Sequence, residues 1–143
     1  MTQSSEGMTQ LLEGKNAVIY GASGSIGRGV ARTFAHEGAT VFLAGRTQNT
    51  LDALASDIIS AGGQAHVAVL DTLNEKAMEE HAKSVVDQFG SIDVSFNLTS
   101  RGDVQGTLLL DMRVDDFMHP TMTGLRQQLQ ERCTGCAGDD AIT

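Results

Sequence analysis

Hydrophobic and polar positions follow two alternating patterns over the first hundred residues. Short, nearly continuous apolar runs indicate strands at residues 16–20, 40–44, 66–70 and 92–96, and the first of them is predicted to be buried. Between these runs, apolar side chains recur every three or four residues, as they do on one face of an amphipathic helix. Helical spacing of this kind joins Ile26, Val30 and Phe34, then Leu51 to Ile59, and then Met78 to Phe89.

This alternation of strands and helices, with short connections, predicts a parallel sheet covered by helices on both faces. We therefore expect an α/β fold over residues 14–126, a Rossmann-type doubly wound parallel sheet truncated to about four strands. Residues 1–13 are polar and are predicted to form a flexible leader. From Ser100 the pattern changes to a long loop that leads towards a helix, and residues 127–143 form an atypical tail without a helical stripe.

Composition narrows the classes of function. The chain has 143 residues, 41% of them hydrophobic and 20% charged, as in a globular domain. Its net charge of -8 argues against nucleic-acid partners and anionic membranes, and no apolar run has the length of a membrane span. The first residues lack the features of a signal peptide, so we expect a cytoplasmic location. Cys133 and Cys136 have no second pair of ligands, so we predict no metal site.

A glycine-rich turn, GASGSIG, joins the first strand to the first helix. Gly21 lets the chain leave the strand sharply, while Gly24 and Gly27 remove side chains where a phosphate and a neighbouring strand approach. The N–H groups of Ser25 and Ile26 would then point at an anion, and the hydroxyls of Ser23 and Ser25 add donors. The alternative is an ordinary tight turn, but the strand-turn-helix context favours a phosphate site.

The end of the second strand carries a basic residue. A site that prefers NAD usually has Asp or Glu there to bind the ribose 2′-hydroxyl, whereas this chain has Arg46 followed by Thr47. A guanidinium favours a 2′-phosphate through its charge and bidentate geometry. A solvated surface arginine is the other reading. The position favours NADP over NAD as the cofactor.

Together these motifs resemble the short-chain dehydrogenase/reductase family, whose cofactor-binding half is matched from about Gly14 to Arg126. The segment LDTLN resembles the family's adenine-contacting segment, which assigns that contact to Asp71 and the backbone of Thr72. The segment DVSFNLTS resembles the fourth-strand motif, which usually ends Asn-Asn-Ala-Gly, and only Asn97 matches it. The resemblance implies an NAD(P)-dependent oxidoreductase that moves a hydride between NADPH and a carbonyl or alcohol carbon.

The family's catalytic residues, a Ser and a Tyr with a Lys four residues later, are absent. The single tyrosine, Tyr20, lies in the first predicted strand and is followed four residues later by Gly24. A solvated helix face and an exposed loop account for His81 and Asp103 better than catalysis does. We therefore assign no catalytic residue, and expect a small-molecule substrate only for a full-length relative.

The sequence leaves three readings of function open. The chain is either the cofactor-binding half of an oxidoreductase, inactive alone, or a non-catalytic NADP(H)-binding module or sensor, or a fragment without function that no longer binds cofactor. The open sheet edge beside residues 94–96 predicts self-association or marginal stability. One permitted set of codons for residues 127–143, read one base later, encodes a family-like helix. This gives the hypothesis of a frameshift after about Arg126, which the encoding DNA would test.

Overall fold

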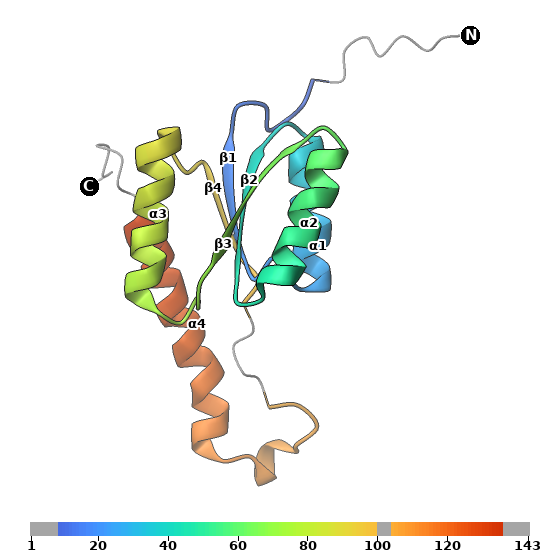
Figure 1. The fold of residues 1–143 in the computed structure, drawn as a ribbon. Coiled ribbons are helices and arrows are strands. Elements are labelled where there is room, and N and C mark those ends of the chain that lie inside the picture. Colours follow the sequence, from blue (N-terminus) through green and yellow to red (C-terminus); the bar gives the residue numbers. More distant parts are fainter. Residues whose placement is uncertain (1–8, 100–103, 136–143) are drawn as a thin grey trace.

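The computed structural model describes residues 9–99 and 104–135, the last six of them by their backbone only. Strands and helices alternate along most of this length (Figure 1). The elements in chain order are β1 (Asn16–Tyr20), α1 (Ser25–His36), β2 (Thr40–Gly45), α2 (Gln48–Ser60), β3 (Gln64–Val69), α3 (Glu75–Phe89), β4 (Val94–Asn97), the short 3-10 helix η1 (Leu109–Asp111) and α4 (Val114–Gly135).

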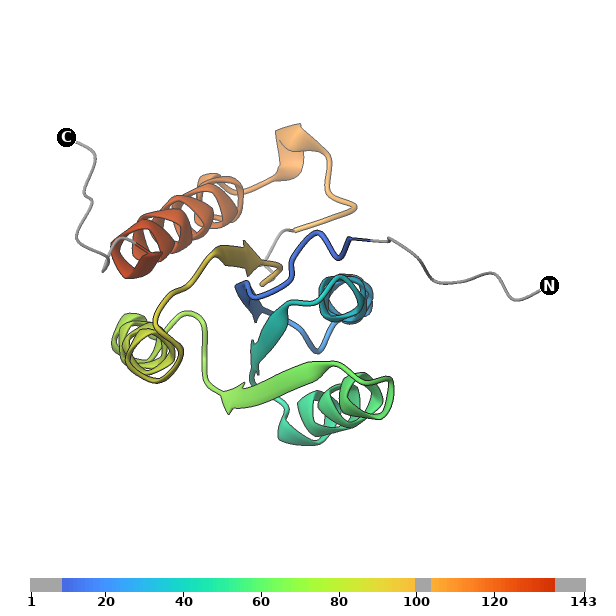
Figure 2. The same ribbon diagram turned by 90° about the horizontal axis from the view of Figure 1, so that it is seen from above.

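The four strands form one parallel sheet in the order β3-β2-β1-β4. Figure 2 shows α1 and α2 on one face of this sheet and α3 and α4 on the other. The predicted doubly wound arrangement is therefore confirmed. The strand order reverses between β1 and β4, since the chain first builds outward through β2 and β3 and then returns to the other side of β1. In open α/β sheets this switch point is where ligands bind.

Two apolar cores lie on opposite faces of the sheet, because successive strand residues point to opposite sides. Ala17 and Ile19 pack with α1 and α2, whereas Val18 and Tyr20 pack with α3. The central strands β1 and β2 are almost fully buried. Strands β3 and β4 lie at the sheet edges and are more exposed, and Val69 of β3 is 53% exposed.

The turn that follows α3 is fastened to the first strand through a buried amide. The side chain of Asn16 donates to the carbonyl oxygens of Phe89 and Ser91, at 3.3 and 3.1 Å. The backbone N–H of Asn16 donates to the carboxylate of Asp93 at 2.8 Å. As predicted, Gly90 ends α3, with a φ of 92° that suits glycine. These hydrogen bonds hold the segment before β4 against the start of β1, and so position the beginning of β4 beside that strand.

The end of the predicted leader lies against the last turn of α1. Leu12 N–H donates to the carbonyl oxygen of Glu37 at 2.9 Å, and Leu11 N–H donates to the Glu37 carboxylate. The side chain of Gln10 donates to the carbonyl oxygen of His36. Residues 10–12 are therefore anchored to the fold, and residues 1–8 lie outside the described residues.

Helix α4 packs beside α3. It continues past residue 126, where the sequence predicts the start of an atypical tail, to Gly135, so that boundary falls inside a helix. Pro120 lies within it and provides no N–H for the usual helical hydrogen bond. Among the described helices, none has the length and apolar character needed to cross a membrane.

Candidate functional site

The glycine turn between β1 and α1 is held together by close backbone contacts. Gly21 has a φ of 77°, and its N–H donates to the carbonyl oxygen of Ala44 at 2.9 Å. A Cβ on Gly21 would lie 2.9 Å from the carbonyl carbon of Leu98, so glycine lets the exits of β1 and β4 meet. By contrast, a Cβ on Gly24 would have only the Gly21 oxygen within 4 Å, at 3.7 Å. Gly24 thus faces open space.

The beginning of α1 presents unused hydrogen-bond donors. Gly24 is its N-cap and provides no side-chain cap, and Arg28 N–H already donates to the Gly24 carbonyl oxygen. The N–H groups of Ser25, Ile26 and Gly27 have no acceptor among the described residues. The first turn also contains no acidic residue, so the positive end of the helix dipole is not neutralised there. This combination suits a bound phosphate.

The end of β2 lies directly beside the glycine turn. Tyr20 is in register with Ala44 in the parallel sheet, which brings Gly45 next to the residues that follow β1. A Cβ on Gly45 would lie 3.6 Å from the Ser23 hydroxyl oxygen. Arg46 and Thr47 come next; both are exposed, and Arg46 forms no ion pair with any residue that the structure describes. The guanidinium charge is therefore available beside the turn.

The residues after β3 continue the same edge of the sheet. Leu70 N–H donates to the carbonyl oxygen of Gly45 at 2.9 Å, which ties the exits of β2 and β3 together. Asp71 is exposed, and one of its carboxylate oxygens accepts a hydrogen bond from Leu73 N–H at 2.9 Å. Thr72 is buried, and its backbone N–H has no acceptor among the described residues. Asp71 and Thr72 thus offer an acceptor and a donor.

The residues after β4 complete the edge. The side-chain oxygen of Asn97 accepts a hydrogen bond from Thr99 N–H at 2.9 Å, which shapes the exit of this strand. Leu98 N–H donates to the carbonyl oxygen of Tyr20, so this segment is held against the glycine turn. The buried hydroxyl of Thr99 has no hydrogen-bond partner among the described residues. Thr99 was not among the predicted site residues, although its place two residues after a strand was a usable signal.

The sequence-predicted site residues therefore gather along one edge of the sheet, at the carboxyl ends of its strands. The edge runs from Asp71 and Thr72, past Arg46 and Thr47, to the glycine turn and then Asn97. N–H donors without an acceptor among the described residues lie in the middle of this row, and further polar groups lie on either side. An elongated ligand with a central anion fits this arrangement.

The residues considered for proton transfer lie elsewhere. Tyr20 is only 1% exposed, and its ring meets His81 of α3 edge-on with 6.2 Å between ring centroids. The interpretation of His81 as part of a solvated helix face is wrong, because its Nδ1 is buried and has no partner among the described residues. Burial lowers the pKa of His81. Asp103 lies outside the described residues.

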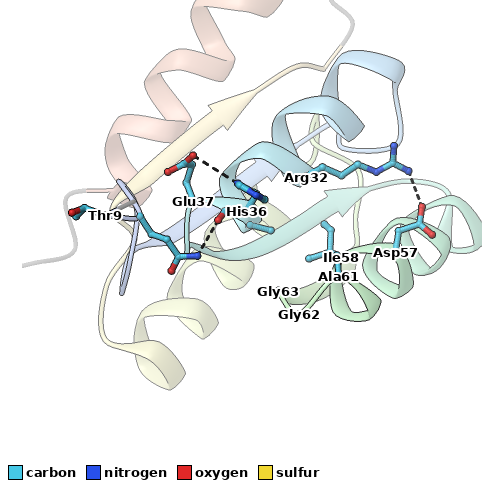
Figure 3. A pocket seen from close by; sticks show the side chains of 11 residues that line it. Thr9, Arg32, His36, Glu37, Asp57, Ile58, Ala61, Gly62 and Gly63 are labelled. Atoms are coloured by element: carbon cyan, nitrogen blue, oxygen red, sulfur yellow. Dashed lines mark hydrogen bonds and ion pairs between the residues drawn. The ribbon is translucent and has the colours of Figure 1, made fainter. Parts of the chain in front are cut away.

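A cavity of about 730 Å³ occurs at a different place, around the last turns of α1 and α2 (Figure 3). Its polar lining is largely paired within the protein. Arg32 contacts Asp57 at 2.7 Å, and Gln10 donates to the carbonyl oxygen of His36. None of the predicted site residues lines it. Because α1 and α2 end there while the glycine turn precedes α1, this cavity lies at the other end of the helices from the candidate site.

Metal binding finds no support in the described part of the chain, which contains no cluster of three or more His, Cys, Asp or Glu side chains placed to hold an ion. The side chains of Cys133 and Cys136 lie outside the described residues.

Comparison with known proteins agrees with this geometry. The sequence model of the family described as short chain dehydrogenase matches residues 15–132. The 3-oxoacyl-(acyl-carrier-protein) reductase of Thermotoga maritima is 33% identical over 106 residues, which are 74% of this chain and 42% of that protein. Hydroxysteroid dehydrogenase-like protein 2 of Danio rerio is 33% identical over 117 residues, 77% of this chain and 28% of that protein.

Solved structures give the same result. A metagenomic short-chain oxidoreductase in complex with NADP superimposes with a TM-score of 0.74 at 29% identity, over 86% of this chain and 55% of that one. For a putative short chain dehydrogenase from Pseudomonas syringae the TM-score is 0.78 at 28% identity, over 90% of this chain and 53% of that one. The chain thus spans about half the length of these structures. It belongs to the short-chain dehydrogenase family of oxidoreductases.

Proposed function

We propose that this chain binds NADP(H) along the carboxyl edge of its sheet, as the cofactor-binding half of a short-chain dehydrogenase. The observation that carries the proposal is the row of unused N–H groups at Ser25, Ile26 and Gly27, next to an open approach at Gly24. The linking phosphates of the dinucleotide would lie on these donors. Asp71 and Thr72 would contact the adenine, and Asn97 would lie beside the ribose nearer the nicotinamide.

Arg46 is proposed to select NADP(H) over NAD(H). It follows β2 directly, is exposed and has no ion-pair partner among the described residues. The 2′-phosphate distinguishes the two cofactors, and a guanidinium can bind it with two charge-assisted hydrogen bonds. The metagenomic short-chain oxidoreductase was solved in complex with NADP, which supports this proposal.

The reaction we propose for the complete enzyme is hydride transfer between NADPH and a carbonyl or alcohol carbon of a small molecule. The nicotinamide supplies or accepts the hydride, and the protein positions the cofactor. This chain alone is not expected to turn over, since Tyr20 is buried in the core and no lysine lies four residues after it. Incubation with NADPH and simple carbonyl compounds should therefore leave the NADPH absorbance unchanged.

Fluorescence titration with NADPH and NADH tests the binding proposal. We expect tighter binding of NADPH, and Arg46→Asp should reverse the order. One charged hydrogen bond contributes about 1.5–3 kcal/mol, so the variant should bind NADPH roughly tenfold to a hundredfold more weakly. Lys83→Glu, which makes the same change of net charge on the exposed side of α3, should leave both affinities unchanged. Equal loss of both cofactors in Arg46→Asp would refute the selectivity role, and a folded chain that binds neither would refute the function.

A further inference from the structure

The cavity at the last turns of α1 and α2 has an apolar floor. Ala35 of α1 and Ile58 of α2 are buried there, and both line the cavity. A Cβ on Gly63 would lie 2.8 Å from the Ile58 side chain and 3.2 Å from the Ala35 side chain, so this floor is closely packed. Gly62 differs, because a Cβ there would meet nothing within 4 Å. The volume of about 730 Å³ is typical of cavities that hold small organic molecules.

The end of α2 carries hydrogen-bond acceptors that the described chain leaves unpaired. The carbonyl oxygens of residues 57–59 accept hydrogen bonds from the N–H groups of residues 61–63, whereas those of Ser60 and Ala61 have no donor among the described residues. The last turn of this helix also contains no basic residue. By contrast, the last carbonyl oxygens of α1, at residues 33–36, all have donors. The negative end of the α2 dipole therefore favours a cation in the cavity.

The charged side chains around the cavity favour a cation as well. In Figure 3, Arg32 and Asp57 lie on one side of the cavity, and His36 and Glu37 lie on the other. With histidine counted as neutral, these groups carry two negative charges and one positive charge. Arg32 donates to Oδ2 of Asp57 at 2.7 Å, and the Oδ1 atom accepts no hydrogen bond from the part of the chain that the structure describes. This pair is more than half exposed and weakly held, so the carboxylate can be shared.

We propose that this cavity binds a small organic cation, in which an ammonium group is joined to a flat apolar body. The ammonium group would donate to the Asp57 carboxylate and to the carbonyl oxygen of Ala61, one helical turn further along α2. The apolar body would cover Ala35 and Ile58, and its removal from water adds to the binding free energy. The site shares no residue with the proposed cofactor site, so the two proposals stand independently.

Tryptamine, an indole that carries a primary ammonium group, is a suitable probe. The chain contains no tryptophan, so the fluorescence of the indole can be excited without a tryptophan background from the protein. Its anisotropy should rise as protein is added, with a Kd of roughly 0.1–1 mM for a ligand of this size. Tryptophol, which has a hydroxyl in place of the ammonium group, and the anion indole-3-propionate should bind at least about fivefold more weakly. Saturating NADP⁺ should leave the affinity for tryptamine unchanged, since the proposed cofactor site lies at the other end of the helices.

Two variants at the rim of the cavity should change this affinity in opposite directions. Asp57→Asn removes the carboxylate and should weaken tryptamine binding about threefold to fivefold. Arg32→Gln removes a like charge and a competitor for the carboxylate, so it should strengthen binding by a similar factor. Asp87→Asn makes the same change as Asp57→Asn on the exposed side of α3, across the sheet, and should have no effect. Circular dichroism melts check that each variant is folded.

Four results would overturn the proposal. Tryptamine that does not bind, or that binds no better than indole-3-propionate, would exclude a cation site. An affinity that Asp57→Asn leaves unchanged, or that Arg32→Gln lowers, would remove the carboxylate from the site or make Arg32 the partner of an anion. Displacement of tryptamine by NADP⁺ would place the probe in the cofactor site, and it counts with the first result.

Discussion

A Cβ atom placed on Gly27 would come within 2.7 Å of the carbonyl oxygen of Gly21, on the opposite side of the same turn. It would also lie 2.8 Å from the Cα atom of Ala22, and both neighbours are rigid backbone. The position of Gly27 is therefore fixed by packing of the turn on itself. Gly24 differs, since no atom closer than 3.7 Å would meet its Cβ. The glycines of this turn thus have separable roles in folding and in binding.

Alanine substitution should separate these roles. Gly27→Ala is expected to destabilise the fold by about 1–3 kcal/mol, because the extra methyl group overpacks the turn. Gly24→Ala should change the melting temperature little. Its φ of -74° and ψ of 166° suit alanine, and the smaller entropy of the unfolded chain offsets the loss of a better N-cap residue. The same variant should bind NADPH much more weakly, because its methyl group occupies the phosphate approach. Thermal melts and fluorescence titrations measure the two effects.

The opposite outcome would reassign these glycines. If Gly24→Ala bound NADPH like the parent chain, the phosphates would not lie over Gly24, and the proposed position of the dinucleotide would be wrong. Gly29→Ala is a useful control, because a Cβ there meets nothing within 4 Å and the residue lies in the middle of α1. It should raise helix stability slightly and leave binding unchanged.

The hydrogen bonds of Asn16 predict a large effect at a position remote from the cofactor site. Asn16→Ala removes the donors to the carbonyl oxygens of Phe89 and Ser91 and leaves these partly buried acceptors unpaired. We expect a loss of about 1–3 kcal/mol in the free energy of unfolding, measured by urea denaturation. Asn49→Ala, on the exposed side of α2, should cost far less. A similar cost for both variants would mean that the Asn16 amide bonds do not set the stability.

The architecture could be predicted from the sequence because the spacing of apolar residues along a helix or strand indicates which of its faces is buried. The glycine turn and Arg46 were predicted from their places after strands, whereas Asp71 and Asn97 were predicted from the family resemblance. In a parallel sheet, whatever follows a strand lies at one common edge, so strand positions alone bring these residues together.

Other features depend on tertiary neighbours that a linear pattern does not contain. His81 lies in a helix with many charged residues, yet its half-buried ring meets the ring of Tyr20 from β1 edge-on. The exposure of β3 and β4 follows from their place at the sheet edges, which strand composition does not reveal. In α4 the apolar residues are spaced like a core face but point outward, so burial and periodicity disagree.

The half-buried imidazole of His81 predicts a specific acid sensitivity. Its pKa lies below the ordinary value of 6.5, because burial penalises the charged form. Below pH 6.5 the unfolded chain therefore binds more protons at this residue than the folded chain does, and the free energy of unfolding falls as the pH falls. Above pH 6.5 the imidazole is neutral in both states, so His81 no longer lowers the free energy of unfolding. His81→Leu should show a smaller decrease in melting temperature between neutral pH and pH 5 than the parent chain.

An equal loss of stability on acidification in the parent chain and in His81→Leu would show that carboxylates elsewhere, and not this histidine, dominate the response.

The hydroxyl of Thr99 predicts a cofactor contact that the family resemblance did not supply. It is buried without a partner among the described residues, and its backbone N–H lies 3.0 Å from where a Cβ on Gly21 would stand. An unpaired buried hydroxyl destabilises a fold unless a ligand pairs with it. Thr99→Val, which keeps the shape and removes the hydroxyl, should therefore leave the melting temperature of the free chain unchanged or higher. The same variant should bind NADPH about threefold to tenfold more weakly, as the loss of one neutral hydrogen bond implies.

Thr33→Val is the matched control, because that hydroxyl already donates to the Gly29 carbonyl oxygen within α1. If Thr99→Val melted lower and bound NADPH normally, the hydroxyl would serve the fold and not the cofactor.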